Sequence, residues 1–422
     1  MEVKPGYKQT EVGVIPEEWV VSLLADVITS FQNGFAFASH GYVKSGIPIV
    51  TMAQIGLDGR FNFTSESVNY WPTEAASALR AFQLFRGDII IAMTDVTPQK
   101  NLIGRMAEVT EIGPLLLNQR VGLFRLDAKK IDPYFLRAMS NSSRWRGYAR
   151  AVASLGVQAN IGTNDIRAGK LPLPPLSEQR AIATALSDVD GLLGGLDRLI
   201  AKKHDLKQAA MQQLLTGQTR LPGFHGEWEV KRLRAIVQTP VTDGPHLTPQ
   251  FFDDGIPFLS VNNLVGNRID LTDLRFISQQ DHEVFSRKCK PQRDDILLGK
   301  AASVGKVAIV ELDCEFNIWS PIALIRVSTD HAARFIYYQL QSADLISQIT
   351  LLTNSSSQGN IGMGDIEKLT LKLPPLPEQT AIASVLTEMD GEMAGLTQRR
   401  EKTRALKQAM MQELLTGRTR LI

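Results

Sequence analysis

The residues that could do chemistry in this sequence lie mainly in polar loops. The first half contains Met93–Lys100 and Gly156–Asn160, and the second half contains Gly299–Lys306 and Ser355–Asn360. Their Gln, Asn, Ser, Thr and Lys side chains are types that read base edges or contact phosphates in nucleic-acid complexes. The alternative for each of them is an ordinary solvated loop position.

A DNA-contacting role for these loops predicts which residues make the contacts. Cationic side chains flank a Gly- or Pro-containing loop after a Gly-Asp-Ile-type strand in both halves. His246 lies in a Gly-Pro turn without a paired nucleophile, which favours a structural or DNA-contacting role over catalysis. The predicted DNA-contacting residues are Gln54, Thr94, Thr97, Gln99, Lys100, Arg105, Gln158, Asn160, His246, Asn262, Asn263, Lys300, Ser303, Lys306, Gln358 and Asn360.

Recognisable catalytic motifs are missing from the sequence. It contains no GxxxxGK[ST], GxGxxG, GxSxG or HExxH. The Asn-Pro-Pro-aromatic run that holds a flipped base in amino-methyltransferases is also missing, and Asp132-Pro133-Tyr134 comes nearest. The two cysteines, Cys289 and Cys314, lack metal-ligand spacing. We therefore expect recognition rather than catalysis, with no catalytic, cofactor-binding or metal-binding residues on this chain.

Composition indicates a globular protein of two or more domains. The chain has 422 residues, is 44% hydrophobic and has a formal net charge of +2. Such a small net charge weakens a DNA-binding interpretation without removing it, because net charge averages over all faces. The first residues lack the apolar core of a signal peptide, and no run approaches the roughly 18 apolar residues that span a bilayer. We expect a soluble cytoplasmic protein without membrane contact.

The sequence repeats itself at a distance of 200 residues. Leu171–Pro222 aligns with Leu371–Ile422 without a gap, and 29 of the 52 positions are identical. Upstream, only short anchors match, and their spacing drifts. The predicted organisation is therefore variable, constant, variable, constant, with limits at 1–170, 171–217, 218–370 and 371–422.

Each constant block predicts one long helix. Pro174-Pro175 precedes it, Ser177 is an N-cap candidate, and Gly217 and Gly417 are C-terminal caps. About 40 residues would extend roughly 60 Å. An apolar stripe at heptad spacing predicts that each helix packs on the other through Ile182, Leu186, Val189, Leu193, Leu196, Ile382, Leu386, Met389, Met393 and Leu396. The alternative is two separate helices, each lying on its own domain.

The variable blocks predict α+β domains. Short β-type runs include Ile47–Thr51, Asp88–Met93 and Val121–Leu126, with counterparts in the second block. Ile131–Ser140 and Ala333–Gln341 predict helices. The fold class is therefore α+β: two globular domains joined by two long antiparallel coiled-coil helices, related by a pseudo-twofold axis.

The whole chain resembles the DNA-specificity subunits of type I restriction–modification systems. The resemblance is carried by the doubled blocks Leu171–Gln179 and Leu371–Gln379, each followed by a long helix ending in Leu-Leu-Thr-Gly. The block openings Ile15–Trp19 and Gly226–Val230 also match. The family's Gly-Asp-Ile-Leu run appears as Gly87-Asp88-Ile89-Ile90, and Asp294 replaces the glycine in the second copy.

The resemblance implies a division of labour. Each variable block would be a target-recognition domain that reads one half of a split DNA site. The helix pair would act as a ruler and dock two methyltransferase subunits, which carry S-adenosylmethionine. Restriction subunits, which use ATP and Mg, would join the full complex. This chain would bind double-stranded DNA and would carry no cofactor itself.

Two other function classes remain open from the sequence. One is an enzyme, a single-chain DNA methyltransferase or nuclease with an unrecognised site, and S-adenosylmethionine binding by the isolated chain would favour it. The other is a coiled-coil scaffold that joins proteins without touching DNA. Sequence-specific DNA protection by the assembled complex would exclude the scaffold.

Overall fold

The computed structural model describes residues 4–97, 99–154, 158–353 and 359–421. The chain divides into two compact units: unit 1 is Met1–Leu196 with Arg399–Ile422, and unit 2 is Asp197–Gln398. The predicted limits at 170/171 and 370/371 lie in strands β14 (Lys170–Leu173) and β25 (Thr370–Leu373), directly before the long helices. Each compact unit also takes up about half of each helix.

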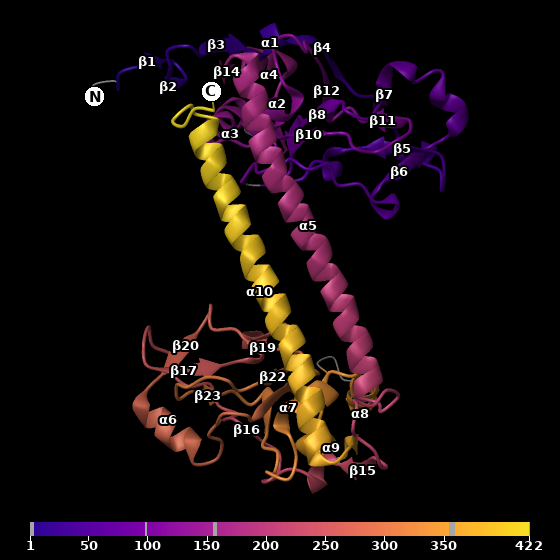
Figure 1. The fold of residues 1–422 in the computed structure, drawn as a ribbon, viewed down its shortest axis with the longest axis vertical. Coiled ribbons are helices and arrows are strands. Elements are labelled where there is room, and N and C mark those ends of the chain that lie inside the picture. Colours follow the sequence, from indigo (N-terminus) through magenta and orange to yellow (C-terminus); the bar gives the residue numbers. More distant parts are fainter. Residues whose placement is uncertain (1–3, 98, 155–157, 354–358, 422) are drawn as a thin grey trace. The chain divides into compact units, whose positions relative to one another are not determined.

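The constant blocks form helices α5 (Leu176–Leu214) and α10 (Leu376–Leu414), each of 39 residues (Figure 1). The prediction that Ser177 is the N-cap is wrong, because the helix already begins at Leu176. The Pro175 carbonyl accepts from the Gln179 amide at 3.0 Å, so the residue before Leu176 occupies the capping position. In both copies the Gln179 or Gln379 side chain donates to the carbonyl of the first proline.

The predicted glycine caps are confirmed at the C-terminal ends. Gly217 and Gly417 both have φ of +73°, the left-handed region that favours glycine. At the second helix the Arg418 amide donates to the Glu413 carbonyl at 3.0 Å, and the Gly417 amide donates to the Leu414 carbonyl at 3.3 Å. This is the Schellman arrangement, and it satisfies carbonyls that have no partner inside the helix.

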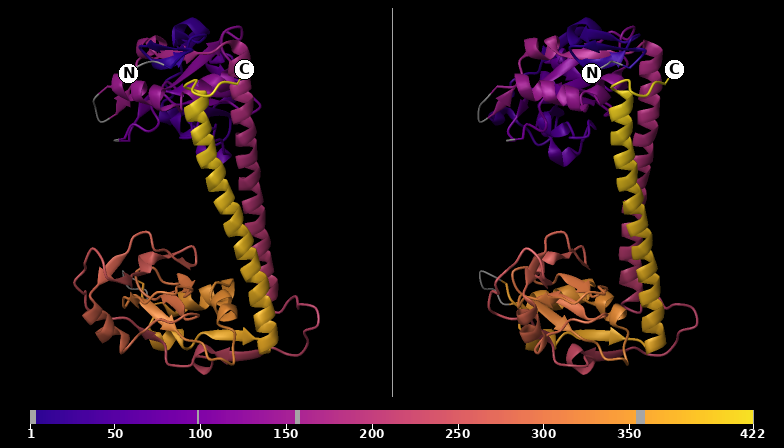
Figure 2. Two further views of the ribbon diagram at one scale, coloured as in Figure 1. Left: turned by 60° about the vertical axis from the view of Figure 1, so that its left-hand side comes forward. Right: turned by 90° about the vertical axis from the view of Figure 1, so that its left-hand side faces the viewer.

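Within each unit the two helices run antiparallel. In unit 1 Ile182 and Leu186 of α5 share a buried cluster with Leu414 and Leu415, at the end of α10 and just beyond it. Figure 2 shows the last turns of α10 beside the first turns of α5 in both views. In unit 2 Ile382 and Leu386 share a cluster with Leu214 and Leu215 in the same way. The start of each helix therefore packs both on its own domain and on the end of the other helix.

Unit 1 is built on a four-stranded sheet in the order β10-β8-β12-β4, with a second four-stranded sheet in the order β6-β5-β11-β7 beside it. The strands are β1 (Tyr7–Thr10), β2 (Gly13–Pro16), β3 (Val20–Leu23), β4 (Ile28–Asn33), β5 (Ile47–Val50), β6 (Asn69–Trp71), β7 (Gln83–Leu84), β8 (Ile89–Ala92), β9 (Thr94–Asp95), β10 (Met106–Glu108), β11 (Leu115–Leu117), β12 (Val121–Leu126) and β13 (Ala159–Asn160). The helices are α1 (Leu24–Val27), α2 (Pro133–Met139), α3 (Ser143–Val152) and α4 (Thr163–Ala168).

Unit 2 repeats this plan, with β16 and β24 shorter than their counterparts β4 and β12 and with one strand fewer in the second sheet. Its main sheet has the order β16-β24-β21-β22, and its second sheet the order β20-β17-β23. The strands are β15 (Glu229–Arg232), β16 (Thr242–Asp243), β17 (Ile256–Leu259), β18 (Leu264–Val265), β19 (Arg268–Ile269), β20 (Arg275–Ile277), β21 (Ile296–Gly299), β22 (Val307–Ile309), β23 (Asn317–Ile318) and β24 (Ile322–Ile325). The helices are α6 (Gln279–Ser286), α7 (Ala333–Gln339), α8 (Ala343–Leu352) and α9 (Met363–Ile366).

The turn before the central strand keeps its geometry in both units despite the change from glycine. Gly87 has φ of +91°, and Asp294 at the matching place has φ of +68°. Asp is one of the few non-glycine residues that visit this region readily. The following acids, Asp88 and Asp295, are both buried.

In each unit the strand directly before the long helix pairs with a strand near the start of the same domain. In unit 1 β3 pairs with β14, and in unit 2 β15 pairs with β25. Trp19 is fully buried, and its Nε1 donates to Glu178 in the first turn of α5 at 2.9 Å, as a core anchor would. Trp228 is half-buried against the core of unit 2. These contacts fix the start of each long helix to its own domain.

Candidate nucleic-acid interface

Two of the predicted DNA-contacting residues of unit 2 meet at one buried carboxylate. Asp243 has no exposed surface. Its Oδ2 lies 3.1 Å from the Nζ of Lys300 and 3.1 Å from the Nε2 of His246, and its Oδ1 lies 2.5 Å from the Nζ of Lys288. We call these four residues the Asp243 cluster. The sequence placed Asp243 in the polar loop 243–246 but did not predict it as a contact residue, and it did not single out Lys288.

The electrostatics of the Asp243 cluster favour an anionic ligand. Burial raises the pKa of the Asp243 carboxyl, but Lys288 and Lys300 lower it more, so that the net pKa is below the ordinary value for Asp. The acid therefore stays ionised and balances only one of the positive charges around it. The side chains of His246 and Lys288 are 70% and 52% exposed, so that they are accessible to a phosphate group.

The loop after β21 is tightly folded. A Cβ at Gly299 would lie 2.4 Å from the Ser303 carbonyl oxygen, so no larger residue fits there. Ala302 has φ of +62°, and the Lys306 side chain is half-buried. This backbone conformation fixes the positions from which the side chains of the predicted residues Ser303 and Lys306 extend.

The matching loop of unit 1 is organised by Asp95 rather than by lysines. Its buried carboxylate accepts from the amides of Thr97 at 2.7 Å and Leu102 at 2.5 Å. Burial raises the pKa of Asp95, but these hydrogen bonds lower it below the ordinary value. Thr97 and Gln99 are exposed at the surface of this loop, whereas Thr94 is buried.

The two cations of this loop are partly engaged in the fold. Lys100 is half-buried, with its Nζ 3.4 Å from the carbonyl oxygens of Ala153 and Ser154. The Nε of Arg105 donates to the Asn101 carbonyl at 2.6 Å.

Two predicted contact residues are buried and support turns of the backbone. Gln54 accepts from the Thr51 amide at 2.9 Å, and Asn263 accepts from the Ser260 amide at 2.9 Å. They occupy equivalent places after β5 and β17. Asn262, next to the second of them, is exposed.

A second loop lies beside each of these faces. Asn160 pairs with Thr94 through β13 and β9, and Asn360 forms an isolated bridge with Ala301. Both asparagines are exposed, and Gln158 is half-buried. Gln358 lies outside the described residues. Each unit therefore brings a loop after its central strand together with a loop before a short helix.

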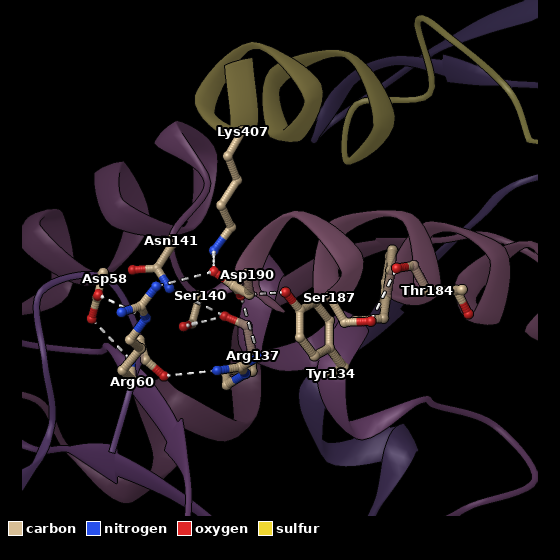
Figure 3. A network of polar contacts seen from close by, with 12 residues as sticks. Asp58, Arg60, Tyr134, Arg137, Ser140, Asn141, Thr184, Ser187, Asp190 and Lys407 are labelled. Carbon is tan, nitrogen blue, oxygen red and sulfur yellow. Dashed lines mark hydrogen bonds and ion pairs between the residues drawn. The ribbon is translucent and has the colours of Figure 1, made fainter. Parts of the chain in front are cut away.

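The predicted helix-pair residues of α5 and α10 are all at least partly buried. Ile182, Leu186, Leu193, Leu196, Ile382 and Leu386 are buried, and Val189, Met389, Met393 and Leu396 are half-buried. Polar residues accompany them. In unit 1 Asp190 of α5 contacts Lys407 of α10 and Tyr134 of α2 (Figure 3). The sequence reasoning missed this network because its members lie far apart along the chain.

Comparison with known proteins identifies the family. A model of the type I restriction modification DNA specificity domain matches the chain twice, at residues 16–201 and 225–404. This chain belongs to the type I restriction–modification DNA specificity family.

Relatives of the family match over most of their length. The "Putative type I restriction enzyme MjaX specificity subunit" of Methanocaldococcus jannaschii is 27% identical, covering 98% of this chain and 97% of the relative. The type I restriction enzyme EcoBI specificity subunit of Escherichia coli is 23% identical, covering 87% and 78%. The crystal structure of a type I system S subunit from M. genitalium has the same fold, with a TM-score of 0.60, 14% identity and 98% of both chains covered.

The two matches to the specificity family follow the repeat. Each includes one globular domain and much of the long helix that follows it. Among the described residues, no group of three or more His, Cys, Asp or Glu side chains could hold a metal ion. The described helices include none that is long and apolar enough to cross a membrane.

Proposed function

We propose that this specificity subunit directs its complex to a two-part DNA site. The domain of unit 1 reads one half, the domain of unit 2 reads the other, and α5 and α10 set the number of base pairs between them. One observation carries this proposal: the chain repeats one frame twice, with 29 of 52 residues identical in the aligned helical blocks and with different side chains on its loops. A protein that reads two different half-sites at one separation needs that combination.

The chemistry of the two loop faces differs in a way that suits different half-sites. Gly34 and Gly244 occupy equivalent places, since a Cβ on either would collide with a carbonyl oxygen, of Leu117 or of Ile318. The residue before this glycine is Asn33 in unit 1 and Asp243 in unit 2. Asp243 forms ion pairs with two lysines, whereas Asn33 carries no charge that could attract them. The loop faces of the two units therefore offer different partners to a phosphate.

The proposed DNA contacts fall into two kinds. In the Asp243 cluster, Lys288, Lys300 and His246 would hold phosphates, which fix the position of the domain on the duplex. Exposed amides such as Gln99 and Asn262 would reach base edges, where Asn and Gln pair with adenine. The half-buried Lys100 and Arg105, and Lys300, whose side chain is only 11% exposed, would need to turn from their partners in the fold to reach DNA.

The chemistry itself would belong to partner subunits. Two methyltransferase subunits would carry S-adenosylmethionine, and restriction subunits would use ATP and Mg. The repeat supports two methyltransferase subunits, because each helix offers some of the same residues to a partner, such as Lys202 and Lys402. This chain would be non-catalytic.

The test is the methylation pattern of a host that expresses the chain with its methyltransferase subunit. We expect a split motif, methylated on both strands and lost when the chain is deleted. Replacing the loop residues of one unit should change one half of the motif only. A continuous motif, or a change in both halves, would contradict the proposal. Stoichiometric S-adenosylmethionine binding by the isolated chain would favour a single-chain methyltransferase instead.

A further inference from the structure

Each unit contains the same three-way polar contact between its domain and both long helices. In unit 1 the Tyr134 hydroxyl donates to Asp190 Oδ2 at 2.5 Å, and the Lys407 Nζ donates to Asp190 Oδ1 at 2.7 Å (Figure 3). In unit 2 the Tyr338 hydroxyl donates to Asp390 Oδ2 at 2.8 Å, and the Lys207 Nζ donates to Asp390 Oδ1 at 2.6 Å. We call these contacts the Tyr–Asp–Lys triads.

The two tyrosines reach their acids from different positions. With Phe135 of α2 matched to Phe335 of α7, Tyr134 corresponds to Arg334, and Tyr338 corresponds to Ala138. The tyrosines therefore lie four residues apart on equivalent helices, which places them on the same face one turn apart. The contact is the same in both units although the residue that makes it is not.

Because the triads are largely buried, losing one of their partners costs more free energy than losing one partner of an exposed ion pair. The side chains of Lys207, Lys407, Asp190 and Asp390 are only 12 to 21% exposed. Losing one partner of such a pair leaves a poorly solvated charge behind. Lys203 and Glu392 also join the two helices, but they are 32% and 47% exposed and contact no domain in the described interactions. That pair is a natural control.

Both triads require one and the same helix register. The residue numbers of the acid and the lysine add up to the same total in both units, as they must for facing positions of an antiparallel pair. A slip of one helix by a turn would move each lysine about 5.4 Å along its acid-bearing partner. It would break both triads at once, and buried polar residues are known to fix register in this way.

We propose that Asp190 and Asp390 are positioning residues that set how firmly each recognition domain is seated on the helix pair, and thereby which spacer length the protein accepts. This inference rests on the proposed function. Each added base pair moves a half-site by about 3.4 Å and rotates it by about 35°. Each acid lies on one long helix and binds both the other helix and the domain. A domain anchored in this way resists displacement along the DNA, whereas a domain without this anchor can shift with the half-site.

The test uses the complex with its methyltransferase subunit and a plasmid library in which the two half-sites are separated by spacers of every length. We expect the wild type to methylate one spacer length. The Asp190→Asn/Asp390→Asn variant should also methylate spacers one base pair shorter or longer. Its preference for the wild-type spacer length over these neighbours should fall about tenfold or more, since a neutral amide holds the lysine less strongly than a carboxylate does. Glu392→Gln should keep the wild-type preference.

The possible results separate this inference from the function on which it rests. A double variant with the wild-type spacer preference would overturn the inference, even if its melting temperature fell. A wild-type complex without any spacer preference would overturn the proposed function and the inference together. If the double variant does not assemble, Tyr134→Phe/Tyr338→Phe decides, because it keeps both Lys–Asp pairs and the ion pairs of Asp190 with Arg60 and Arg137, and removes the tyrosine hydrogen bonds to the two acids. A broadened preference there supports the inference, and an unchanged one rejects it.

Discussion

At the scale of single residues, the Asp243 cluster shows how one buried acid holds two lysines and a histidine close together. Sequence reasoning selected His246 and Lys300 from loop chemistry alone, and the structure brings them to the same carboxylate. Sequence reasoning could not select Asp243 as a site residue, because its contact with Lys288, 45 residues later, exists only in the folded chain. Likewise, Gln54 and Asn263 have the right chemistry for base contact, but burial and a backbone partner were invisible in the sequence.

The cluster predicts a measurable electrostatic contribution to DNA binding. The Lys288→Ala/Lys300→Ala variant should weaken binding of the complex to its site. It should also reduce the slope of log affinity against log salt by about two, roughly one for each phosphate that is no longer neutralised. Lys129→Ala, an exposed lysine in a turn of unit 1, is the matched control and should leave the slope unchanged. An unchanged slope in the double variant would show that these lysines do not meet phosphate.

Asp243 also predicts a pH dependence of stability. Its pKa in the folded chain is lowered, so its ionised form stabilises the fold above the unfolded pKa of about 3.9. That stabilisation is lost as the pH falls through the lower folded value. Asp243→Asn should therefore cost roughly 1–3 kcal/mol at pH 7, and its difference from the wild type should shrink in acid. Urea unfolding of both proteins between pH 7 and pH 3 measures this, and a constant difference would contradict it.

At the scale of elements, the parts with strong local signals could be predicted from the sequence. The predicted strands around Ile47, Asp88 and Val121 are confirmed as β5, β8 and β12, and the two predicted short helices as α2 and α7. The long helices were recognisable because proline, heptad stripe and glycine cap agree along 39 residues. The Ser177 cap was wrong because the Pro175 carbonyl already serves the first turn. Pairings such as β15 with β25 join segments about 140 residues apart and carry no local signal.

The glycines of the long helices give a prediction with its own control. Gly217 ends the first helix with φ of +73°, so Gly217→Ala should destabilise unit 2 by about 1 kcal/mol. Gly191 lies inside α5, and a Cβ added there would meet no atom within 4 Å. Gly191→Ala should therefore stabilise the protein by roughly 0.5–1 kcal/mol, because alanine loses less conformational entropy in a helix. Thermal melts of the two variants should move in opposite directions, and equal shifts would refute the cap assignment.

At the scale of the whole molecule, the proposed ruler can be lengthened without disturbing either unit. The division between the two compact units falls between Leu196 and Asp197 on α5 and between Gln398 and Arg399 on α10. One heptad inserted at both places keeps each Tyr–Asp–Lys triad, because both triads lie wholly within their units. It also nearly preserves the facing stripe, since seven residues complete almost two turns.

The doubly extended variant should therefore prefer a longer spacer. Seven residues add about 10.5 Å of helix, which corresponds to roughly three base pairs at 3.4 Å each. A heptad in α5 alone cannot keep Lys207 facing Asp390 and Lys407 facing Asp190 in one register, so this variant should lose assembly with the methyltransferase subunits. Both variants can be scored on the same spacer library, with gel filtration to follow assembly. A doubly extended variant that assembles and still prefers the original spacer would show that the helix pair does not set the spacing.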